Sequence, residues 1–140
     1  MTAPDAAMLE PVNKIARFIA GGGDENLSAF ASEGVAILEN FAPYLFTGPG
    51  AVTGWARAMR AHAEHLRDMV HSFGPAQDFA SDGARAYFSL PTHWTGMSRG
   101  VRFAEDGGWA FVLVRETGGW RVRHYGWAVT GITVLPQAAF

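Results

Sequence analysis

The sequence predicts an α+β fold in which helices from the first half of the chain lie on one face of a bent antiparallel sheet. Apolar residues recur at helical spacing in much of residues 11–70, whereas after Gly74-Pro75 they alternate as in half-buried strands. Glycine-containing turns separate the alternating segments, which is typical of an antiparallel meander. Short helices cannot completely fill the concave side of a bent sheet, so we expect a pocket there.

Length and composition indicate one domain, residues 1–140, with a substantial apolar core. The chain has 49% hydrophobic residues and a net charge of -2, with no basic stripe for nucleic acid. It contains no cysteine, which excludes disulfides and thiolate metal sites. The N-terminal residues do not resemble a secretory signal, and no segment is long and apolar enough to span a bilayer. We therefore expect a cytoplasmic protein with no nucleic-acid or membrane partner.

The first two helices are predicted at residues 11–20 and in the segment that follows Asp24. Pro11 suits a helix start, and the glycines at 21–23 suit its end. Asp24 is the expected N-cap of a second, short helix, which stops at Gly34. The buried face of this second helix is predicted to contain Leu27, Phe30 and Ala31.

A short strand and a third helix are expected next. Residues 35–38 are a brief apolar run that favours a strand, and Pro49-Gly50 interrupts the chain before a helix over residues 51–70. The apolar stripe of that helix consists of Val52, Trp55, Met59, Leu66 and Met69.

The rest of the chain is predicted to form strands at residues 84–95, 109–115 and 120–135. Turns are expected at Ser81-Asp82-Gly83 and Thr117-Gly118-Gly119. Residues 96–108 fit either a bulged strand or a separate hairpin arm. Strands that wrap around helices need bulges, for which the candidates are Pro91, Gly96, Gly126 and Gly131.

Four segments carry a family resemblance that covers nearly the whole chain. They are RFIAGGGD (residues 17–24), AFASEGVAILEN (29–40), FTGPGAVTGW (46–55) and GWRVRHYGWA (119–128). In this order and at these spacings, the chain resembles the SnoaL-like group of the nuclear transport factor 2 / ketosteroid isomerase superfamily. The resemblance implies a cone-shaped curved antiparallel sheet wrapped around three N-terminal helices, and commonly a homodimer formed through the outer sheet face. Its members include isomerases, cyclases, dehydratases, hydrolases and binding modules, so the fold alone does not define the function.

The resemblance makes Glu39 the candidate catalytic residue. In ketosteroid isomerases a base carboxylate lies nine positions before the turn glycine, which here is Gly48. Burial would raise the pKa of such a carboxyl toward a useful range. The two hydrogen-bond donors of those isomerases are absent, because Phe18 replaces a tyrosine and residues 111–114 contain no acid. The alternatives for Glu39 are an exposed strand end or an ion pair with Arg123.

Other polar residues are weaker candidates. Tyr44 is placed either at the pocket rim or in a loop where it only packs, and His62 lies near the apolar stripe of the third helix. His62 and His65 lack a third ligand, so neither a metal nor a cofactor is expected. Alternation places His93 on the outer sheet face, unless a bulge at Pro91 reverses it.

The pocket is predicted to bind a small hydrophobic ligand. Arg123, Tyr125 and Trp127 share one face of the last strand, which the family pattern directs inward, although Trp127 could instead be only core. Three functions remain open: a ligand-binding module, an isomerase, cyclase or dehydratase that uses Glu39, and a structural dimerisation module. The predicted apolar lining consists of Phe18, Trp55, Phe88, Trp94, Tyr125 and Trp127.

Overall fold

The computed structural model describes residues 2–136 and confirms the α+β class. One curved, unclosed sheet has the strand order β2-β1-β7-β6-β5-β3, with β4 also paired to β5. All pairs are antiparallel except β1 with β7. The elements are α1 (Ala6–Ile19), the 3-10 helix η1 (Asp24–Ala29), β1 (Ala36–Leu38), β2 (Leu45–Thr47), α2 (Ala51–His62), β3 (Leu66–Phe73), β4 (Gln77–Ser81), β5 (Arg85–Ser98), β6 (Val101–Glu116) and β7 (Gly119–Val134).

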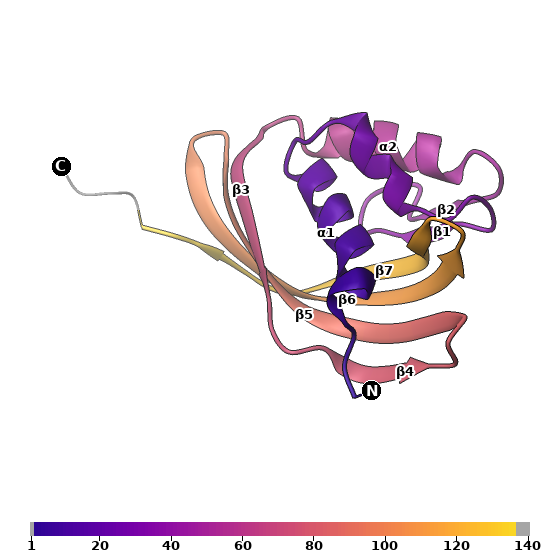
Figure 1. Cartoon of the computed structure of the whole chain (residues 1–140). Coiled ribbons are helices and arrows are strands. Elements are labelled where there is room, and N and C mark those ends of the chain that lie inside the picture. The colour runs from indigo at the N-terminus through magenta and orange to yellow at the C-terminus, as the bar shows by residue number, and fades with distance from the viewer. Residues whose placement is uncertain (1, 137–140) are drawn as a thin grey trace.

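Both α-helices lie over the same face of the curved sheet, whereas the β5–β6 turn and the end of β7 extend beyond them (Figure 1). Inward residues beneath α1, such as Phe88, Phe111 and Val122, are fully buried. At the far end of the same strands, Ile132 and Val134 are more than 60% exposed. The sheet therefore has a packed half and an open half. Neither α-helix within residues 2–136 has the length and hydrophobicity that a bilayer span requires.

The helix starts differ from the prediction. Helix α1 begins at Ala6, five residues before the predicted start, because the Asp5 side chain accepts a hydrogen bond from the backbone N–H of Met8 at 2.9 Å. Pro11 lies inside this helix and is buried. Asp24 is not an N-cap, since η1 begins without a side-chain cap and Asp24 instead forms an exposed ion pair with Arg60 at 2.7 Å.

The third helix is shorter than predicted. Helix α2 ends at His62, and residues 66–73 form β3 on the edge of β5. The register shifts between Arg67 and Val70, and Asp68 adopts a positive φ of 55°. This bulge places two inward side chains, Leu66 and Met69, three residues apart, a spacing that imitates a helix.

The long strands confirm the predicted meander but place its bulges elsewhere. The β5–β6 register is continuous from Arg85↔Val114 to Ser98↔Val101, so residues 96–108 are the joined ends of two long strands. Pro91 and Gly96 were candidates for bulges, and the continuous register shows that neither is one. In the β6–β7 pair the extra residues are Arg123 and Thr130, as shown by the register shifts on either side of them.

Candidate functional site

Glu39 follows β1 directly, and its carboxylate is held by two donors from other elements. Its side chain is buried, with 7% exposure. Oε2 accepts a 2.8 Å hydrogen bond from the indole Nε1 of Trp55 on α2. The same oxygen accepts a hydrogen bond from the hydroxyl of Tyr125 on β7, whose backbone pairs with Ile37 of β1. A helix and two strands therefore orient one carboxylate.

The second oxygen of Glu39 is free to meet a ligand. No donor within residues 2–136 bonds Oε1, and Oε1 is not among the fully buried polar atoms that lack a partner. Glu39 lines the cavity, and we infer that Oε1, the oxygen without a donor, is the one that borders it. The geometry gives one oxygen a structural role and leaves the other available for chemistry.

Burial sets the protonation behaviour of this site. Loss of solvent raises the pKa of Glu39 from 4.5 to about 7, partly opposed by the hydrogen bonds from Tyr125 and Trp55 and slightly increased by the charge of Glu105. Burial, and then the adjacent Glu39 carboxylate, raise the pKa of Tyr125 well above 10, so its hydroxyl remains a neutral donor. Glu39 consequently populates both its acid and its base form near neutral pH.

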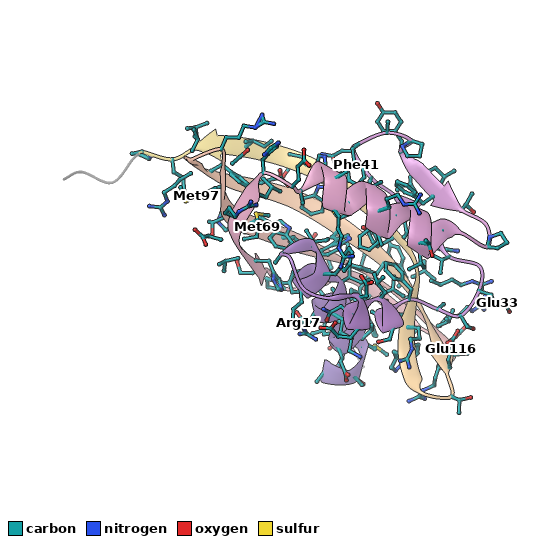
Figure 2. The ribbon with its side chains drawn as sticks, turned by 90° about the horizontal axis from the view of Figure 1, so that it is seen from above. Arg17, Glu33, Phe41, Met69, Met97 and Glu116 are labelled. Carbon is teal, nitrogen blue, oxygen red and sulfur yellow. The ribbon has the colours of Figure 1, made fainter. Side chains whose placement is uncertain are left out.

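The cavity beside Glu39 has a volume of about 530 Å³, within the range of small-molecule sites. It lies at the open half of the sheet, between the residues that follow β1 and the start of β3. Phe41 and Met69, which line it from these two segments, are labelled in Figure 2. Its aromatic walls consist of Phe41, Trp94, Phe103, Trp109, Tyr125 and Trp127.

Two further titratable side chains line the cavity. His62, at the end of α2, stacks on Phe41 with ring centroids 4.3 Å apart, and partial burial lowers its pKa. Glu105 enters from β6, and burial raises its pKa. The sequence prediction missed Glu105. The sequence did contain a sign of its position. Counting back from Trp109 in steps of two residues places Glu105 and Phe103 on the same inward face of the strand. Across residues 2–136, no group of three or more histidine or acidic side chains is placed to hold a metal.

Three predicted lining residues lie behind the cavity instead of on its surface. Phe18 packs on Trp55, with centroids 5.2 Å apart, and Phe88 packs on Phe111 at 5.8 Å, so both are core residues. Trp55 is completely buried and reaches the site only through its bond to Glu39. The prediction of these three residues as cavity lining was wrong, because the helices cover the packed half of the sheet and bury them in the core. The predicted residues that do line the cavity are Glu39, His62, Trp94, Tyr125 and Trp127.

Tyr44 and Arg123 also lie outside the cavity. Tyr44 is 62% exposed, which corrects its assignment to the pocket rim. Arg123 is the bulged residue of β7, so it leaves the inward face and lies beside Gly34. It forms no ion pair with Glu39. The same bulge allows both Val122 and Tyr125, three residues apart, to point inward.

Two other histidines, His93 and His124, lie away from the cavity. His93 contacts Asp106 across the strands, with 2.7 Å between Nδ1 and Oδ1, and both side chains are exposed. The Nε2 of His124 lies 3.1 Å from the carbonyl oxygen of Gly34. The outer-face assignment of His93 is therefore confirmed.

Residues 20–126 match the family described as the SnoaL-like domain. The chain belongs to the SnoaL-like family. A comparison of this SnoaL-like domain with curated proteins finds no significant match.

Solved structures share the fold of this SnoaL-like domain at low sequence identity. Hexachlorocyclohexane dehydrochlorinase LinA-type3 from Novosphingobium barchaimii has a TM-score of 0.77 at 10% identity, covering 96% of this chain and 92% of that one. A putative scytalone dehydratase from Novosphingobium aromaticivorans has a TM-score of 0.71 at 12% identity, covering 91% and 84%. A putative ketosteroid isomerase from Shewanella frigidimarina has a TM-score of 0.67 at 17% identity, covering 89% and 96%. At these identities the likeness concerns the fold alone.

Proposed function

We propose that this SnoaL-like domain is an enzyme that transfers a proton at a carbon atom of a small, mainly apolar molecule, as an isomerase, cyclase or dehydratase does. One observation carries the proposal: Glu39 is buried at an open cavity, with Oε2 held by two donors and Oε1 unpaired. A module that only binds apolar molecules has no need of an oriented, buried carboxylate, which is unfavourable to desolvate.

In the proposed reaction, ionised Glu39 accepts a proton from substrate carbon at Oε1. Trp55 and Tyr125 keep the carboxylate in position, so little reorganisation is needed when the proton moves. A pKa of about 7 makes Glu39 both a competent base and, once protonated, a competent acid. Returning the proton to another carbon completes an isomerisation, whereas departure of a leaving group completes an elimination.

The names of the structural neighbours support this class of reaction, since they include a dehydrochlorinase, a putative dehydratase and a putative isomerase. The second candidate is a binding module. Phe18 favours it, because this core residue has no hydroxyl where the related isomerases have a donor. A cavity of about 530 Å³ argues against a domain whose interior is filled only by side chains.

The base-promoted ring opening of 5-nitrobenzisoxazole tests the proposal without knowledge of the natural substrate. One proton leaves carbon, the N–O bond breaks, and a coloured cyano-nitrophenolate forms. We expect the wild type to catalyse this reaction with a rate that rises through about pH 7, the pKa of Glu39. Glu39→Gln should lower the rate by about 100-fold or more.

Glu10→Gln is the matched control, because Glu10 is an exposed carboxylate on α1 that does not line the cavity. It should leave the rate and its pH profile unchanged. Equal rates for wild type and Glu39→Gln would reject the proton-transfer role. If a ligand nevertheless bound the cavity equally well in both proteins, the binding module would be the better description.

A further inference from the structure

The charge on the cavity walls is one-sided. Two carboxylates, Glu39 and Glu105, line it, and partial burial of His62 lowers its pKa, which favours the uncharged imidazole. None of the described residues that line it is a lysine or an arginine. Arg102, three residues before Glu105 in the sequence, is exposed and does not line the cavity. An anionic ligand would therefore meet negative charge with no cationic side chain on the cavity wall to balance it.

The aromatic walls add to this preference. Trp94, Trp109 and Trp127 line the cavity together with Tyr125 and two phenylalanines. The face of an aromatic ring attracts a cation within about 6 Å, and tryptophan does so most strongly. The unpaired indole Nε1 of Trp109 is fully buried, so this donor is not exposed on the cavity surface to attract an anion.

The chemistry of Glu39 points the same way. Proton removal that creates an oxyanion would place a new negative charge beside Glu105, with no lysine or arginine on the cavity wall to balance it. Besides Tyr125 and the tryptophans, the other lining residues with side-chain donors are Asn40, His62 and Ser98. Proton removal from carbon next to a C=N⁺ group is different. The C–H electron pair forms a carbon–carbon double bond and the C=N π pair moves to nitrogen. A cation and a carboxylate thus become two neutral groups, so the cavity has no new negative charge to stabilise.

We propose that the cavity takes a small organic cation with an apolar body, its positive nitrogen near Glu39 and Glu105 and its body against the aromatic walls. This inference rests on the proposed function, because it names the substrate class of the same site. Glu39 is buried, lines the cavity and has no donor on Oε1, and this unpaired oxygen is the feature that a cation satisfies.

Two probes of the same shape, one cationic and one neutral, test it: phenyltrimethylammonium and tert-butylbenzene. Binding is followed at pH 8 by titration calorimetry and by the fluorescence of the wall tryptophans. We expect the cation to bind about tenfold or more tightly than the neutral probe. Glu105→Gln should weaken the cation by about tenfold and leave the neutral probe unchanged.

Asp106→Asn is the matched control, because it removes a charge one residue along β6 on the exposed outer face. It should change neither affinity. The cation inference is overturned if tert-butylbenzene binds as tightly as phenyltrimethylammonium, if the cation does not bind at millimolar concentration, or if Glu105→Gln has no effect. None of these results concerns 5-nitrobenzisoxazole, whose ring opening separately reports whether Glu39 transfers protons.

Discussion

Trp55 donates its indole N–H to Oε2 of Glu39 over 2.8 Å, a contact that ties helix α2 to the end of strand β1. Trp55 has no exposed surface, and the second donor, Tyr125, is 2% exposed. The orientation of the carboxylate therefore depends on the packing of the core as much as on the cavity. Substitutions behind the cavity should change the chemistry in front of it.

Trp55→Phe should raise the pKa of Glu39 above its present value of about 7, because the hydrogen bond from Trp55 stabilises the ionised carboxylate. The midpoint of the pH–rate profile should move upward with it. Loss of the bond and of ring volume should lower the free energy of unfolding by about 1 to 3 kcal/mol. An NMR titration of the Glu39 carboxyl and urea unfolding measure the two effects. An unchanged titration midpoint would contradict the role given to Trp55.

The stability of the wild type should decrease between pH 4.5 and pH 7. The pKa of Glu39 is about 7 in the folded protein and 4.5 in the unfolded chain. The protonated carboxyl therefore makes its full contribution to the free energy of unfolding below pH 4.5. It is lost as the pH rises through 7, by about 3 kcal/mol in total.

Urea unfolding of wild type and Glu39→Gln across this range measures that contribution. The difference between the two proteins removes the effects of the other shifted groups, Glu105, His62 and His71. Parallel curves for the two proteins would show that Glu39 is not the group responsible.

Gly107→Ala should destabilise the fold by about 1 to 3 kcal/mol and displace Trp127 from the cavity wall. A Cβ at Gly107 would overlap the Trp127 ring and the carbonyl oxygen of Ala128. The neighbouring Gly108 provides the control, since a Cβ there meets nothing within 4 Å. Thermal unfolding and tryptophan fluorescence should separate the two variants. Similar behaviour of both would mean that Trp127 moves aside at little cost.

Asp5→Ala should lower stability by about 1 kcal/mol, because Asp5 caps the first turn of α1. Asp24→Ala should change it by about 0.5 kcal/mol or less, since its ion pair with Arg60 is exposed. Chemical denaturation of both variants gives the comparison. A larger loss for Asp24→Ala would restore the N-cap role that its sequence context suggested.

The sequence predicted the fold class, the meander and the position of Glu39 at the cavity better than it predicted the walls of the cavity. Strand alternation survives wherever the register is continuous, which is why Trp94 was placed correctly. A bulge breaks the alternation without a clear sequence mark. At β3 it made Leu66 and Met69 look helical, and at β7 it removed Arg123 from the inward face.

The remaining differences concern which half of the sheet the helices cover. Phe18 and Phe88 are aromatic, as pocket-lining residues often are. The packing of α1 against the covered half of the sheet places them in the core instead. Glu105 was missed because a charged residue in an irregular-looking segment is typical of a surface. The small hydrophobic ligand, the homodimer and the cytoplasmic location stay predictions.

The division of the sheet into a packed half and an open half has a consequence for how such a chain can diversify. Residues that hold the fold lie under the helices, whereas Val101, Ile132 and Val134 line the cavity while remaining largely exposed. Replacing them removes little buried surface, so substitutions there should have small effects on stability. New ligand preferences can then arise by changing the open ends of β6 and β7, with Trp55, Tyr125 and the carboxylate they hold left untouched.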